Sequence, residues 1–110
     1  MHPRRGEVWW VAFDPAVGGE IRKTRPALII SNNAANIALN RVTVVPLTSK
    51  TAKVYPGQAV VMLNGEFRKA MADQLTTAAK ERLRSKLGEL SVSDVAGVES
   101  AIFVHLGIRR

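Results

Sequence analysis

The sequence has no cysteine and only two histidines, His2 and His105. Disulfides, thiolate catalysis and thiolate metal sites are therefore excluded, and a histidine-based triad is disfavoured. Acidic residues are also few, with 9 Asp+Glu against 16 Lys+Arg, and they lack the paired spacing of a two-metal phosphotransfer site. No Gly-x-x-x-x-Gly-Lys-[Ser/Thr] phosphate loop is present. We therefore expect no metal site and no cofactor.

Long hydrophobic runs are missing as well. A membrane-spanning helix needs roughly 18–20 apolar residues, and no run in the chain comes near that length. The apolar stretch at residues 8–13 is too short for the core of a signal peptide. With 110 residues, 46% of them hydrophobic and 23% charged, we expect one globular domain over residues 1–110. We expect it to be cytoplasmic, with no membrane contact.

The net charge is +7 and the isoelectric point is about 10.6. A small domain with this surplus attracts polyanions, of which nucleic acid is the commonest in a cytoplasm. Many small soluble domains are also simply basic. Charge alone therefore leaves nucleic-acid contact as one of two interpretations.

The chain predicts several short strands followed by one helix. Residues 7–13 are dense in β-branched and aromatic residues with apolar side chains on both faces, which indicates a strand buried on two sides and favours a core or interface role for Trp9 and Trp10. Further strands are expected at residues 26–31, 42–48, 58–63, 69–75 and 87–90, and helical turns at 32–40 and 79–86. Pro46 predicts an edge or bulge position, and Asn64-Gly65 a tight hairpin turn.

The terminal helix has the clearest signals. Ser91 and Asp94 have capping-box spacing, and apolar residues recur at helical intervals up to Gly107, which is suited to a C-terminal cap. Short strands with a turn signal about every ten residues, followed by one helix, predict a mostly β protein built as a small, partly closed antiparallel barrel.

Two polar clusters lie at strand ends. The first, Arg22-Lys23-Thr24-Arg25, follows a glycine loop, and Pro26 biases Arg25 toward an extended backbone. Arg25 is either a planar two-pronged donor to a phosphate or a solvated residue on the rim. The second cluster, Thr48-Ser49-Lys50, has hydroxyls that either donate to phosphate oxygens or make local turns.

Taken in order, several segments of the chain resemble the MazF/PemK/Kid family of toxin endoribonucleases. The likeness covers nearly the whole chain and rests on Arg5-Gly6-Glu7-Val8-Trp9, Asp14-Pro15, Gly18-x-Glu20, Arg25-Pro26-Ala27-Leu28-Ile29-Ile30-Ser31, Val44-Val45-Pro46-Leu47-Thr48-Ser49, Lys53-Val54-Tyr55-Pro56 and Asp73-Gln74-Leu75. The resemblance implies an SH3-like barrel with a terminal helix that works as a homodimer. It also implies metal-independent cleavage of single-stranded RNA at short specific sequences, which stops translation and growth.

The resemblance also implies roles for individual residues. Arg25 and Thr48 fall on the family's catalytic pair, and Glu20 is either the general base or a residue that shapes its loop. Substrate contacts are expected from the loops at residues 17–24 and 49–57 and from one further family position, namely from Gly19, Arg22, Lys23, Ser49, Lys50, Lys53 and Gln74. Many family members have Ser or His where Gly19 stands, so a side-chain hydrogen bond from that position is lost here.

The expected partners are single-stranded RNA, a second copy of the chain and an acidic antitoxin that folds onto the toxin. DNA would be contacted only through the antitoxin. Two other interpretations stay open at this stage. One is an SH3-like barrel that binds nucleic acid without cutting it, and the other is an interaction module whose chief partner is a protein.

Overall fold

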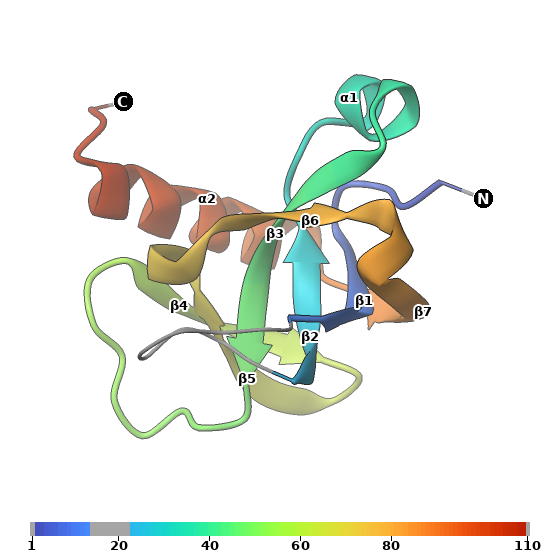
Figure 1. Cartoon of the computed structure of the whole chain (residues 1–110). Coiled ribbons are helices and arrows are strands. Elements are labelled where there is room, and N and C mark those ends of the chain that lie inside the picture. Colours follow the sequence, from blue (N-terminus) through green and yellow to red (C-terminus); the bar gives the residue numbers. More distant parts are fainter. Residues whose placement is uncertain (1, 14–22, 110) are drawn as a thin grey trace.

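The structure is a computed structural model that describes residues 2–13 and 23–109. The described residues form a curled antiparallel sheet with a C-terminal helix, which confirms the predicted mostly β, partly closed fold (Figure 1). The strands are β1 Glu7–Ala12, β2 Thr24–Ile29, β3 Arg41–Thr48, β4 Gln58–Leu63, β5 Glu66–Met71, β6 Thr76–Ala79 and β7 Leu83–Glu89. Two α-helices, α1 Asn33–Ala38 and α2 Val92–Leu106, and two 3-10 turns, η1 Ala72–Gln74 and η2 Lys80–Arg82, complete it.

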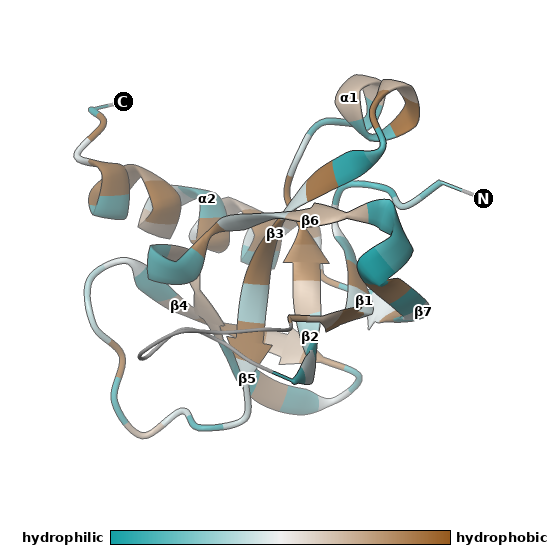
Figure 2. Ribbon diagram, in the orientation of Figure 1, coloured by the Kyte–Doolittle hydropathy of each residue, from teal (hydrophilic) through white to brown (hydrophobic). Residues whose placement is uncertain are grey.

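The strand order is β4-β5-β3-β2-β1-β7, and β6 pairs with β3 beyond the end of β5. Every strand pair is antiparallel. The central strands β1, β2 and β3 are the most apolar part of the sheet, as Figure 2 shows in brown.

Each face of the sheet carries its own apolar cluster. Side chains alternate between the two faces of a strand, so Val8 belongs to one cluster, whereas Trp9 and Val11 belong to the other. Trp9 is only 4% exposed, which confirms its role in the core and the prediction that its strand is buried on both sides. In β3, Val45 and Leu47 face the first cluster and Val42 and Val44 the second.

The helix α2 covers the face that carries the first cluster. Val98 and Ala101 of the helix are buried there with Leu28, Leu47 and Val61 of the sheet. Ser91 caps the helix by accepting a hydrogen bond from the Asp94 N–H (3.1 Å), and Gly107 ends it in the left-handed conformation, both as predicted. The Asp94 carboxylate accepts the backbone N–H of Met62 (2.9 Å), so it fastens the helix to the free edge of β4.

Pro46 is fully buried in the middle of the sheet, so of the two positions predicted for it, an edge or a bulge, the edge is wrong. On one side β3 pairs continuously with β2. On the other side it pairs with β6 over Arg41–Val44 and with β5 at Leu47–Thr48, which leaves Val45 and Pro46 between two ladders. A proline fits this interruption because it has no N–H to donate.

The predicted boundaries of the second half are also partly wrong. Pairing in the hairpin begins directly at Glu66, opposite Leu63, so the fifth strand covers Glu66–Met71 instead of residues 69–75. The two-residue turn imposes this early start. Of the helical turn expected at residues 79–86, only η2 is present. It lies between β6, which the sequence did not predict, and β7, which is longer than expected. Pairing partners far along the chain decided these strands, since their local sequence is polar.

The two ends of the sheet meet where the β4–β5 turn lies against β7. The Asn64 side-chain amide donates to the Leu87 carbonyl (3.0 Å). A Cβ at Gly88 would lie 2.8 Å from the Asn64 Oδ1 and 3.1 Å from the Leu63 Cδ1. A side chain at position 88 would therefore force Asn64 or Leu63 to move at the place where the two ends of the sheet meet.

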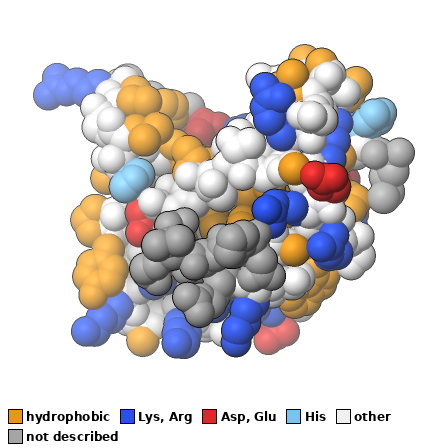
Figure 3. All heavy atoms as spheres, viewed as in Figure 1, with side chains coloured by type: hydrophobic (Ala, Val, Ile, Leu, Met, Phe, Trp, Pro, Cys, Tyr) orange, Lys and Arg blue, Asp and Glu red, His pale blue; other side chains and the backbone are white. Residues whose placement is uncertain are grey.

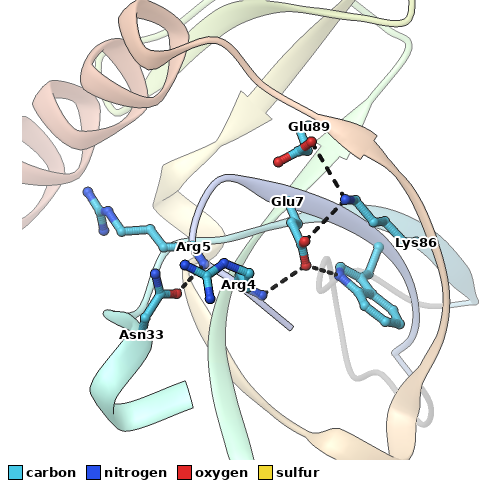
Figure 4. A network of polar contacts seen from close by, with 7 residues as sticks. Arg4, Arg5, Glu7, Asn33, Lys86 and Glu89 are labelled. Carbon is cyan, nitrogen blue, oxygen red and sulfur yellow. Dashed lines mark hydrogen bonds and ion pairs between the residues drawn. The ribbon is translucent and has the colours of Figure 1, made fainter. Parts of the chain in front are cut away.

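An ion pair between Glu7 and Lys86 also joins β1 to β7. Glu7 is buried and accepts hydrogen bonds from the Trp9 indole N–H (3.0 Å) and the Arg4 backbone N–H (2.9 Å), while Lys86 lies 3.1 Å from its other oxygen (Figure 4). Burial by itself raises the pKa of Glu7, but these hydrogen bonds and the Lys86 ammonium outweigh it and hold the pKa below its ordinary value. The hydrogen bond to Glu7 in turn raises the pKa of Lys86. The carboxylate is thus ionised and satisfied inside the fold.

Candidate active site

Arg25 is the second residue of β2 and is half-buried. Its Cα partner in β1 is Val11, and it shares its face of the sheet with Ala27 and Ile29 of the second apolar cluster. Arg25 therefore projects from the face opposite α2. Its extended backbone agrees with the bias that Pro26 imposes on the residue before it.

Thr48 is the last residue of β3 and is 9% exposed. It lies on the same face as Val42 and Val44, which is again the face opposite α2. Its hydroxyl oxygen accepts the backbone N–H of Lys50 (3.3 Å), so the turn-making role expected of such hydroxyls is present. The remaining lone pair and the hydroxyl proton leave capacity for a ligand.

The register between β2 and β3 relates these two residues. Leu28 pairs with Val45 and Ala27 with Pro46. The paired residues end at Ala27–Pro46, and the same register counted two residues further puts Arg25 level with Thr48. Both residues lie at the end of the sheet where β2 begins and β3 ends, the lower end in Figure 1.

Ser49, Lys50 and Lys53 follow Thr48 in the β3–β4 loop, and all three are exposed. On the face seen in Figure 3, Lys and Arg side chains lie along the lower edge of the molecule, the same side as these strand ends. Lys50 and Lys53 thus add two positive charges shortly after Thr48, which suits a phosphate backbone.

Lys23 is exposed, has a φ of 68° and directly precedes β2. Its carbonyl accepts the Phe13 N–H (2.9 Å), so the two ends of the segment between β1 and β2 are joined. The predicted site residues Gly19, Glu20 and Arg22 lie in that segment, outside the described residues.

Gln74 ends η1 and is half-buried, with its amide directed at the Met71 sulfur (3.8 Å). Because β5 pairs with β3 up to Leu47 and β6 resumes pairing at Val44, η1 lies beside the middle of β3. Gln74, one of the predicted RNA contacts, therefore lies beside the middle of β3. It does not lie at the end of the strand, where Thr48 is.

The structure also brings in one residue that the sequence did not single out. Lys69 of β5 is the Cα partner of Thr48, so Arg25, Thr48 and Lys69 form a row across three neighbouring strands. The Asn64-Gly65 turn could have placed Lys69 opposite Val60 by counting outward from the turn. Its position beside Thr48 depends on the pairing of β5 with β3, for which the sequence holds no local signal.

Residues 2–13 and 23–109 contain neither a cluster of metal ligands nor a membrane-spanning helix. In that part of the chain, no three His, Asp or Glu side chains gather in a way that could hold a metal ion. None of the helices in the same residues has the length and apolarity needed to cross a membrane.

Residues 4–106 match the family described as the PemK-like, MazF-like toxin of type II toxin–antitoxin systems. The chain belongs to this family. The match takes in Arg25, Thr48 and Lys69 together with the rest of the sheet and all of α2.

Two curated relatives are similar over most of their length. Endoribonuclease MazF9 of Mycobacterium tuberculosis is 40% identical over 114 residues, covering 96% of this chain and 97% of the relative. The endoribonuclease toxin MazF of Escherichia coli K12 is 32% identical over 108 residues, covering 96% of this chain and 95% of the relative.

Solved structures agree on the fold. MazF from Deinococcus radiodurans superposes with a TM-score of 0.87 at 26% identity, covering 98% of this chain and 99% of that one. A mycobacterial endoribonuclease in complex with its cognate antitoxin superposes with a TM-score of 0.82 at 27% identity, covering 98% of each chain.

Proposed function

We propose that this chain is the toxin of a type II toxin–antitoxin system and a metal-independent, sequence-specific endoribonuclease that cuts single-stranded RNA. The observation that carries the proposal is the register that brings Arg25 opposite Thr48 at a basic strand end. Family membership and the endoribonuclease names of the relatives MazF9 and MazF support it. The chain acts as one domain over residues 1–110, in the cytoplasm, and halts translation by destroying messages.

RNA carries its own nucleophile, which is why the chemistry needs no activated water. The 2′-oxygen attacks the adjacent phosphorus in line, the bond from phosphorus to the 5′-oxygen breaks, and the products are a 2′,3′-cyclic phosphate and a 5′-hydroxyl. The proton of the 2′-hydroxyl passes to a base, for which Glu20 is the candidate, and the departing 5′-oxygen takes up a proton.

Arg25 binds the non-bridging oxygens of this phosphate and neutralises the charge that builds up on them, and its guanidinium also helps to deliver the proton to the leaving group. Thr48 donates its hydroxyl proton to the same phosphate and orients it. Because Thr48 is nearly buried and tied to the Lys50 N–H, its oxygen is held in place before substrate arrives. Such preorganised donors act without reorganisation during the reaction.

The surrounding residues hold the strand. Gly19, Arg22 and Lys23 from the first loop, Ser49, Lys50 and Lys53 from the second and Gln74 from η1 contact the RNA backbone and the bases next to the cut. Single-stranded bases can be splayed out and read in this way, whereas a duplex keeps them stacked.

The proposed partners follow the same family. The solved mycobacterial endoribonuclease was captured with its cognate antitoxin, and Deinococcus radiodurans MazF with MazE. We extend this to an acidic antitoxin that covers the basic site of this chain, to a homodimer as the working form, and to DNA contact only through the antitoxin.

The test is incubation of the purified protein with a long single-stranded RNA in EDTA. We expect discrete fragments with 5′-hydroxyl ends, and a loss of about 10²–10³-fold in cleavage rate for Arg25→Ala. Arg41→Ala is the matched control, because it removes the same charge from the opposite end of β3. Thr48→Ser should keep most of the activity that Thr48→Val loses.

Two results would contradict the proposal. Intact RNA with retarded mobility would identify a nucleic-acid binder that does not cut. An Arg25→Ala protein that cleaves as fast as the wild type would remove Arg25 from the reaction even if RNA is cut.

A further inference from the structure

Lys69 lies in one row with Arg25 and Thr48, but the proposed mechanism does not use it. It lies directly across from Thr48 in the β3–β5 ladder and across from Val60 in the β4–β5 hairpin. Cross-strand partners project from the same face of a sheet, so its side chain rises beside that of Thr48, opposite α2. It is half-buried at this position.

The Lys69 ammonium is bonded to the loop that follows Thr48. Its Nζ donates to the backbone carbonyl of Lys53 at 2.9 Å, which joins residues 16 positions apart in the chain. A hydrogen bond from a charged donor is stronger than one between neutral groups. The bond therefore ties the middle of the loop at residues 49–57 to the same rigid ladder that holds Thr48.

The remaining anchors of this loop lie at its two ends. Near its start, the Lys50 N–H is bonded to the Thr48 hydroxyl. At its far end, the Gly57 carbonyl accepts the Asp73 N–H (3.1 Å), and the Gly57 backbone lies so close to His105 of α2 that a Cβ there would come within 3.2 Å. Among the described residues, positions 51–54 between these ends receive one hydrogen bond, the one from Lys69.

We propose that Lys69 is a positioning residue for substrate selection. It sets the distance between the β3–β4 loop, with its candidate RNA contacts, and the phosphate held by Arg25 and Thr48. This role of Lys69 rests on the proposed function. Lys69 determines which nucleotides beside the cut are accepted, while Arg25 and Thr48 carry out the reaction itself. A loop released from Lys69 would present the same cations over a wider range of positions and read the bases less strictly.

The experiment compares Lys69→Met, which keeps the apolar stem and removes the donors, with Lys69→Arg, which keeps a charged donor. Lys80→Met is the matched control, because it removes an equal charge at η2, beside the opposite end of β3. Three quantities are measured for each protein: backbone order parameters of residues 51–54 from NMR relaxation, cut sites along one long RNA, and kcat and KM on an oligonucleotide containing the preferred site.

For Lys69→Met we expect lower order parameters at residues 51–54, additional cut sites, and a KM about tenfold higher, which corresponds to one lost charge-assisted contact, with kcat changed less. Lys69→Arg should restore the order parameters and the cut-site pattern. Lys80→Met should keep both and raise KM only slightly. If Lys69→Met does not fold, Lys69→Gln replaces it in the same comparison.

The proposal is overturned if Lys69→Met, or the Lys69→Gln that replaces it, keeps the wild-type cut-site pattern, or if Lys80→Met changes the pattern equally. A wild type that does not cut RNA would overturn the proposed function and the selection role together. In that event the order parameters still decide separately whether Lys69 anchors the loop.

Discussion

Closure of the sheet depends on a position with no room for a side chain. At Gly88, a methyl group would meet the Asn64 Oδ1 at 2.8 Å and the Leu63 Cδ1 at 3.1 Å. Leu63 is 2% exposed and packed in the core, so it has little freedom to withdraw, while Asn64 can withdraw only by giving up its bond to the Leu87 carbonyl. Gly88→Ala is therefore an overpacking substitution.

The cost follows from these two neighbours. Overpacking by one methyl group and loss of one neutral hydrogen bond destabilise the fold by about 1–3 kcal/mol. For a chain of this length, that lowers Tm by roughly 4 °C per kcal/mol, or about 4–12 °C. The free energy of unfolding is measured in urea and Tm by calorimetry on the same samples.

Gly97 provides the matched control. It lies inside α2, exposed, with nothing within 4 Å of a Cβ at that position. The same substitution there should stabilise the protein by about 0.5–1 kcal/mol, because alanine loses less backbone entropy in a helix. The same Gly→Ala substitution should thus lower the stability at position 88 and raise it at position 97.

A double-mutant cycle tests the cause. Asn64 has a φ of 50°, which glycine adopts without strain, so Asn64→Gly removes the side chain and keeps the turn. In that background the cost of Gly88→Ala should fall by at least half. If Gly88→Ala leaves Tm within 1 °C of the wild type, or its cost is unchanged beside Asn64→Gly, the reasoning about closure is refuted.

Two further predictions concern the contacts that Glu7 and Asp94 make with the sheet. Because the pKa of Glu7 is lowered in the folded state, its ionised form contributes stability that is present above its ordinary pKa of 4.5 and is lost as pH falls through the folded value. The Tm difference between wild type and Glu7→Gln should therefore be steady from pH 5.5 to 7.5 and shrink below 4.5; a difference that is unchanged at pH 3 would contradict this. Asp94→Ala should lower stability by about 1 kcal/mol in urea, by releasing the Met62 N–H and the negative charge at the start of α2. Asp94→Asn keeps an acceptor oxygen and should recover part of the loss, whereas equal losses in both variants would assign the effect to charge alone.

Local patterns determined much of this protein. The dense run around Trp9 implied a strand buried on both faces, Ser91 and Gly107 bounded the terminal helix, and Asn64-Gly65 placed the hairpin. Each of these signals acts between residues close together in the chain, where backbone conformation and side-chain alternation are set by immediate neighbours. The order of short motifs along the chain also indicated the toxin family.

The tertiary structure decided the rest, because pairing between distant strands has no local signature. Thr76–Ala79 is polar and becomes a strand only because β3 offers it a partner, and Pro46 is tolerated in a central strand only because the ladder on one side is interrupted there. In the same way, the sequence could name Arg25 and Thr48 as candidates, but only the β2–β3 register brings them opposite each other. Lys69 joins them solely through the fold: its neighbour in space is Thr48, 21 residues earlier in the chain, and contacts at that separation are made by packing of the whole sheet.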